Sequence, residues 1–172
     1  ATFDLTKKIF EYLHIPLTLY KDEELNISTD ILLIKNILTL LIEIKEHNFT
    51  EKFKHAFLSL ARSYLYHLED EEIFEYFKGF TFKNSPIYQD LEPLAKKIDI
   101  LSIKEIIEEV LEITNFYEKI ITIGNIKETI TRIDQITKLS ENYNKMGQTI
   151  YEFQDFLNEL LKKEEKIKYN LG

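Results

Sequence analysis

The chain has 172 residues, of which 44% are hydrophobic and 30% charged, a balance typical of a globular domain that buries a core. Its 22 basic and 30 acidic side chains give a formal net charge of −8. This argues against strong binding of nucleic acid by the chain alone, because such affinity comes largely from neutralised phosphates. With no cysteine, the chain has no disulfide, thiolate zinc site or cysteine nucleophile. The absence of cysteine is consistent with a cytoplasmic location, which we expect, and no signal peptide opens the sequence.

The sequence contains few residues that interrupt helices. Only 4 glycines and 3 prolines occur, and the abundant Ile, Leu, Lys and Glu favour helices. We therefore predict an all-α fold, an irregular bundle of about eight helices with at most one short strand or hairpin. We expect residues 1–172 to form a single domain.

The first third of the chain predicts a short helix, a strand and a long apolar helix. Asp4 is positioned to cap the first helix, and the alternating residues 17–20 favour a strand. The long helix begins at Ser28 or Thr29 and runs to about His47. Its apolar run is broken by polar residues and is too short to span a bilayer. We expect this helix to be buried on most sides and expect no membrane contact.

Two further helices are predicted between residues 50 and 79. Thr50 starts the third helix. Its apolar face comprises Phe53, Phe57, Leu60, Ala61 and Tyr64. A fourth helix covers roughly residues 70–78 and ends at Gly79, where we expect the left-handed conformation.

Capping signals divide the remaining chain. Ser85 and Pro86 mark an N-cap and first turn, and we expect Pro93 to kink or divide the helix that follows. Later helices begin where a Ser, Thr or Asn precedes a Glu by three residues. These pairs are Ser102 with Glu105, Asn125 with Glu128, and Thr149 with Glu152.

One histidine lies beside a cluster of carboxylates. On a helix, His67 and Glu71 would share a face, as two metal ligands require, with Glu69, Asp70 and Glu72 nearby. The alternative is an acidic first helical turn, which the helix dipole favours. We favour this alternative, because no second histidine has matching spacing. The chain also lacks a phosphate-binding glycine loop, so we predict no ATP site and no cofactor in this chain.

The third helix also carries a basic and polar stripe. Its members are Lys52, His55, Ser59, Arg62 and Tyr66. On an acidic chain such a stripe favours contact with phosphates. The alternative is an ordinary solvated helix face.

Read in order, five segments resemble one protein family. They are residues 7–20 (with the turn HIPL at 14–17), 22–44, 61–70 (ARSYLYHLED), 101–120 and 131–157. Their order and hydrophobic pattern resemble UvrD-type superfamily 1 DNA helicases, and best the AddA/RexA branch of helicase–nuclease subunits. The matching portion is the accessory subdomain 2B, which is inserted into the second RecA-like motor domain.

The resemblance implies a noncatalytic accessory domain of an ATP-dependent DNA helicase/exonuclease in double-strand-break repair and recombination. Such a domain packs on RecA-like motor domains and orients duplex DNA, with a second helicase–nuclease subunit as a further partner. Residues 1–20 would form the edge of the adjoining motor domain. ATP and Mg²⁺ would be bound by the longer parent protein, of which this chain is a piece. The alternative is a helical interaction module that docks on a partner subunit without touching DNA.

The same resemblance implies candidate DNA-binding residues. Arg62 and Ser63 match the family pattern, and Lys52 and His55 lie on the same predicted face. In the family, a glycine-containing turn after this helix lets backbone amides approach duplex phosphates. Here His67 and Glu69 occupy that turn, and the carboxylate of Glu69 would repel phosphate. A third interpretation, an autonomous enzyme that uses His67 and the adjacent acids, follows only from the metal hypothesis.

Overall fold

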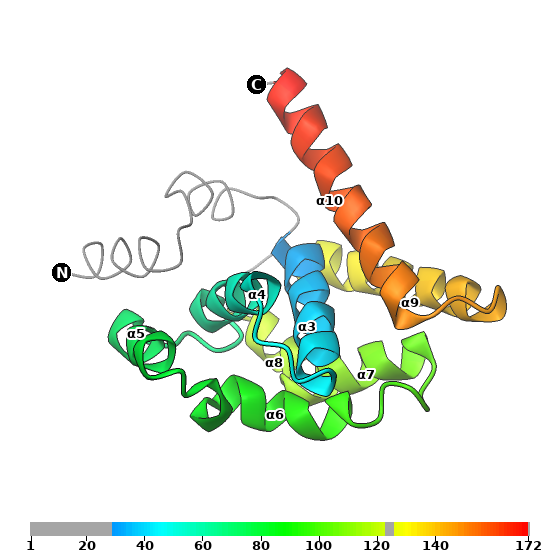
Figure 1. Ribbon diagram of the computed structural model, residues 1–172. Helices are drawn as coiled ribbons and strands as arrows, with labels where there is room; N and C mark the ends of the chain where they lie inside the picture. The colour runs from blue at the N-terminus through cyan, green and yellow to red at the C-terminus, as the bar shows by residue number, and fades with distance from the viewer. Residues whose placement is uncertain (1–28, 123–125, 172) are drawn as a thin grey trace.

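The computed structural model describes residues 29–122 and 126–171, with side chains from residue 30 to residue 163. Within these ranges it contains eight α-helices, one 3-10 helix and no strand (Figure 1), so the predicted all-α class is confirmed. The elements are α3 (Thr29–Lys45), α4 (Glu51–Arg62), α5 (Asp70–Gly79), η1 (Phe82–Asn84), α6 (Pro86–Ala95), α7 (Ile103–Ile113), α8 (Phe116–Ile120), α9 (Ile126–Lys145) and α10 (Ile150–Leu171). The helix predicted from Asp4 and the strand predicted at residues 17–20 lie outside the described residues.

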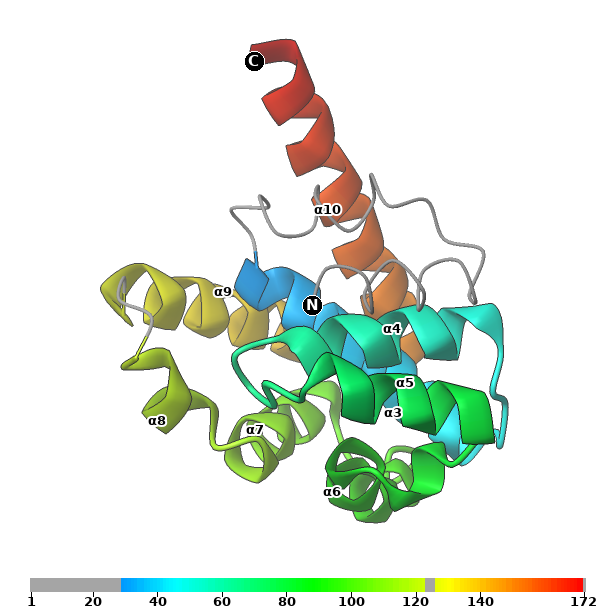
Figure 2. The same ribbon diagram turned by 90° about the vertical axis from the view of Figure 1, so that its left-hand side faces the viewer.

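Helix α3 is the centre of the bundle. Of residues 31–44, all are buried except Leu32 and Lys35, which are half-buried. Helices α4, α6, α9 and α10 pack around it, and Figures 1 and 2 show it enclosed from several sides. The prediction of a helix buried on most sides is confirmed. A helix that is apolar on nearly all sides favours a central position, because any side left exposed would place apolar area in water.

Polar groups of α3 are satisfied by neighbouring elements. Asp30, which is 3% exposed, accepts a hydrogen bond of 2.6 Å from Nε of Arg132 on α9. Glu43, near the other end of α3, is also buried and accepts a hydrogen bond from the Thr50 hydroxyl. Buried carboxylates are tolerated when they are paired in this way.

Local capping signals set most helix starts. The Thr50 and Ser85 side chains accept hydrogen bonds from the third residue of α4 and α6. Ser102 and Glu105 form a full capping box, and these hydrogen bonds from Ser102 hold the pKa of the Glu105 carboxyl below its ordinary value. The Glu152 carboxylate accepts the backbone N–H of Thr149 at 2.8 Å. These four predictions are confirmed, whereas Asn125 lies outside the described residues.

Three features differ from the sequence predictions. Gly79 is the last residue of α5, and Phe80 takes the left-handed conformation instead, with φ of 52°. Pro93 lies in the last turn of α6 and does not divide this helix, which continues to Ala95. The short α8 was not predicted; it follows Asn115, whose left-handed φ of 54° reverses the chain after α7.

A cluster of aromatic rings joins α4, α5 and η1. Its centre is Phe82, which is 1% exposed. The Phe82 ring centroid lies 5.0 Å from those of Phe57 and Phe77, and both pairs are T-shaped. Phe49 and Phe80 complete the cluster on its outer side. Such edge-to-face contacts add to the stabilisation from burial.

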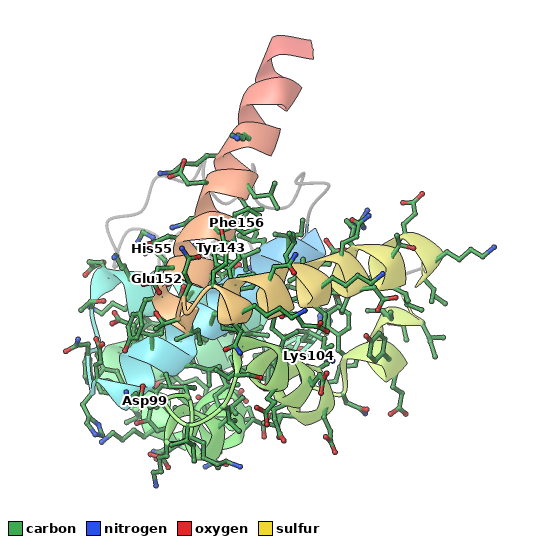
Figure 3. The ribbon with its side chains drawn as sticks, turned by 90° about the vertical axis from the view of Figure 1, so that its right-hand side faces the viewer. His55, Asp99, Lys104, Tyr143, Glu152 and Phe156 are labelled. Carbon is green, nitrogen blue, oxygen red and sulfur yellow. The ribbon has the colours of Figure 1, made fainter. Side chains whose placement is uncertain are left out.

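Helices α9 and α10 are joined by a short turn and cross at a large angle (Figures 1 and 3). Figure 3 shows Tyr143 of α9 beside Phe156 of α10, with ring centroids 5.3 Å apart. The first half of α10 packs near α3, and its remaining length projects away from the other helices (Figure 1). Gly147, in the turn between the two helices, has a φ of 75° that side-chain-bearing residues rarely adopt.

Two glycine substitutions are predicted to have opposite effects on stability. Gly79→Ala should raise the free energy of unfolding by about 0.4–1 kcal/mol, because the position is helical and the unfolded chain loses freedom. The added Cβ would meet only Thr81, at 3.4 Å. Gly147→Ala should lower the free energy of unfolding by about 1–2 kcal/mol, because alanine is strained at positive φ. Urea unfolding of both variants measures this, and equal effects would contradict the assignment of the left-handed positions.

Candidate functional site at the turn between α4 and α5

The segment that carries the predicted site residues is the turn that connects α4 to α5. It lies at the left ends of these two helices in Figure 2. Ser63 follows the last residue of α4 and caps that helix with its backbone N–H, which donates to the Leu60 carbonyl at 3.1 Å. The Ser63 hydroxyl donates to the same carbonyl at 2.6 Å and accepts the N–H of Leu65 at 3.2 Å. The hydroxyl of Ser63, a predicted DNA contact, therefore makes its hydrogen bonds within the turn.

The backbone amides of the turn are also engaged. The N–H groups of Tyr66 and His67 donate to the Ser63 carbonyl at 3.2 and 2.7 Å, and that of Leu68 donates to Ala61 at 2.8 Å. His67 has a φ of 48°, in the left-handed region. Together with Leu65, four consecutive amides donate within this segment.

Two side chains from distant parts of the sequence hold the turn in place. Lys119 of α8 donates to the Leu65 carbonyl at 2.6 Å, and its ammonium lies 5.1 Å from the centroid of the Tyr66 ring. The Tyr66 hydroxyl donates to Asp90 of α6 at 2.7 Å. Burial, and then this hydrogen bond, raise the pKa of Tyr66. Sequence reasoning did not find Lys119 or Asp90, because no local pattern links them to residues 54 and 24 positions away.

An ion pair spans the two ends of the turn. Arg62, the last residue of α4, donates to the carboxylate of Asp70, the first residue of α5. The Asp70 side chain is 6% exposed and that of Arg62 is 19% exposed. The guanidinium that the resemblance assigns to DNA thus neutralises a buried carboxylate of its own chain. A buried pair of this kind is costly to break, since it leaves one charge uncompensated.

The other two predicted residues, Lys52 and His55, are exposed on α4. Lys52 lines a polar cleft of about 290 Å³ between α3, α4 and α10, together with the carboxylates of Glu43, Glu46 and Asp155. Desolvation, reinforced by Lys35 and opposed by Glu51, lowers the pKa of His55, so its neutral form is favoured at pH 7. The predicted stripe is interrupted as well, because Tyr66 lies in the turn rather than on the helix.

The geometry assumed for a metal site is not present. His67 lies in the turn, three residues before α5 begins, so it does not share a helix face with Glu71. Among residues 29–122 and 126–171, no group of three or more histidines and carboxylates is arranged to hold a metal ion. Asp70, Glu71 and Glu72 form the first turn of α5, as the interpretation of an acidic helix start predicted.

Comparisons of the chain with protein-family models, with curated protein sequences and with solved structures each find no match. In the part of the chain that the structure describes, none of the helices combines the length and apolar character needed to cross a bilayer.

We predict that the Arg62–Asp70 pair stabilises the fold. Arg62→Ala should lower the free energy of unfolding by about 3 kcal/mol, because the Asp70 carboxylate would remain buried without its cation. Lys52→Ala, a control on the same helix, should change it by less than about 0.5 kcal/mol. Urea unfolding followed by circular dichroism compares the two variants. Equal stabilities would show that Arg62 has no structural role in the turn.

Proposed function

We propose that this chain is a noncatalytic helical accessory domain of an ATP-dependent DNA helicase–nuclease, similar to subdomain 2B of UvrD-type enzymes. The observation that supports this most directly is the backbone of the turn between α4 and α5. In the family that the sequence resembles, this turn contains glycine. His67 takes the left-handed conformation that glycine favours, with φ of 48°, so the shape of the turn fits the proposed relationship although the residue differs.

The role we propose is packing on adjacent RecA-like motor domains, with weak contact to duplex DNA. Amides that approach phosphates must have free N–H groups, and the four amides from Leu65 to Leu68 already donate within the segment. The exposed carboxylates of Glu69 and Glu71 follow directly. Within the proposal, Lys52 and His55 are the residues left to meet duplex phosphates, and the neutral form of the imidazole is favoured at pH 7.

A second candidate function is a helical interaction module that docks on a partner subunit without touching DNA. The side chains of Arg62 and Ser63 favour this function, because both are hydrogen-bonded to groups of their own chain. The formal net charge of −8 favours it too, because a polyanion is repelled by an acidic surface.

In this proposal, the residues that bind and hydrolyse ATP lie in other parts of the parent enzyme. The 172 residues contain no phosphate-binding glycine loop, so ATP and Mg²⁺ would be bound by the motor domains, in a cytoplasmic enzyme. Reading the coding sequence on both sides of this chain tests the proposal. A Walker A motif upstream and a helicase motif soon after residue 172 are the expected result. An open reading frame that carries neither would contradict it.

We also predict how the chain binds duplex DNA. Binding should be weak, and its affinity should fall as salt rises, with a logarithmic slope of about −0.9 for each phosphate neutralised. Lys52→Gln combined with His55→Gln should abolish most of this binding. Lys162→Gln combined with Lys163→Gln, two exposed lysines of α10, is the matched control. Fluorescence anisotropy of a labelled duplex measures the affinity.

Three outcomes of this titration are informative. Weak, salt-dependent binding that only the α4 variant loses supports the accessory-domain proposal with DNA contact. No binding at low salt supports the docking module instead. Tight binding that salt does not weaken contradicts both.

A further inference from the structure

Phe80 is an exception among the phenylalanines of this chain. It is 55% exposed, more than any other aromatic side chain among the described residues. Every other described phenylalanine is buried or half-buried. A single exposed apolar side chain needs no explanation by itself. The surroundings of this ring, however, set it apart in conformation and in charge.

The ring is held in a fixed position at the edge of the aromatic cluster. Its centroid lies 5.4 Å from that of Phe49 and 5.3 Å from that of Phe82, and both contacts are T-shaped. The backbone of Phe80 has a φ of 52°, a conformation that costs a residue with a side chain about 1–2 kcal/mol. Gly79, which would adopt it without this cost, precedes it in a helical conformation. The fold therefore presents an ordered aromatic ring to solvent.

The chain segment around Phe80 is basic, whereas the whole chain is acidic. Residues 76–89 contain Lys78 and Lys83 and no carboxylate, in a chain of formal net charge −8. Both lysines are exposed. Their Cα atoms lie two and three residues from Phe80, hence within about 8 and 11 Å of its Cα. Within the described residues no ion pair joins either ammonium to a carboxylate, whereas Lys45 and Lys104 are paired.

We propose that Phe80, Lys78 and Lys83 form a binding site for single-stranded nucleic acid. An unpaired base stacks on the Phe80 ring, and the flanking phosphates lie against the two ammonium groups. Aromatic side chains next to cations are the combination that binds unpaired strands, because every base has a π-face and every nucleotide a phosphate. A base inside a duplex is stacked on both faces and cannot bind here. The site stands on these side chains alone and does not depend on the helicase–nuclease proposal.

The test uses the absence of tryptophan from the chain. Phe80→Trp introduces a single tryptophan at the site, and stacking of a base quenches its fluorescence. Titration with an eight-nucleotide oligothymidine should quench it at low salt. The logarithm of the affinity should fall with the logarithm of salt with a slope of about −1.4, for two phosphates on a single strand. Ile100→Trp is the control, because Ile100 is 81% exposed and lies outside the site, so the fluorescence of this variant should not change.

Two further variants separate stacking from charge in the otherwise native chain. Phe80→Leu keeps an apolar side chain against Phe49 and Phe82 but removes the π-face, and should weaken binding on the order of tenfold. Lys78→Gln combined with Lys83→Gln should remove most of the salt dependence. Lys96→Gln combined with Lys97→Gln makes the same change of charge at two exposed lysines elsewhere and should leave binding unaltered. Anisotropy of the labelled oligonucleotide measures affinity, and thermal melting by circular dichroism confirms that each variant folds.

The proposal is overturned if the fluorescence of the Phe80→Trp variant is not quenched, or if that of the Ile100→Trp variant is quenched equally. It is also overturned if both lysine pairs have the same effect, which would indicate general attraction to cations. If the Phe80→Leu variant binds the strand with the same affinity as the native chain, the ring does not stack on a base. The exposed ring would then be a contact for protein. Loss of duplex binding in the Lys52 and His55 variant, with single-strand binding intact, would separate this site from the proposed function.

Discussion

The fold depends on the burial of one helix, α3, on nearly every side. Residues 31–44 expose only parts of Leu32 and Lys35, so the surrounding helices must supply a continuous apolar wall. This requirement explains why α4, α6, α9 and α10 come from the whole length of the chain yet meet at one element. It also explains the ion pair between the buried Asp30 and the half-buried Arg132, since a carboxylate at the start of a buried helix needs a cation from a neighbour.

Around this helix, the turn between α4 and α5 is a closed unit of hydrogen bonds. Its serine hydroxyl, its consecutive amides and its arginine are all bound within the chain. Lys119 and Asp90 then fix the turn to α8 and α6. The hydrogen-bonding groups of this segment are therefore already used within the chain. The segment is poorly suited to phosphate, which needs donors that are still free.

The two ends of α5 present different chemistry to solvent. The first turn carries the exposed carboxylates of Glu71 and Glu72, where the helix dipole favours negative charge, whereas Asp70 is buried and paired with Arg62. The last turn leads into Phe80, between Lys78 and Lys83, where no carboxylate occurs from residue 76 to residue 89. A helix of ten residues thus separates an acidic surface from a small basic and aromatic one.

The sequence by itself determined the helical class, the central buried helix and the capped starts of α4, α6, α7 and α10. These features depend on residues within four positions of one another, so a linear pattern contains them. It indicated a turn at His67 and Glu69 but kept Tyr66 on the preceding helix, and only the tertiary structure decided that the turn begins after Arg62 and what it does. Arg62 faces a buried Asp70, and Lys119 reaches Leu65 across the fold. The left-handed residue is Phe80 rather than Gly79, because contacts with Phe49 and Phe82 fix the ring, and such contacts between distant segments form only when the chain packs.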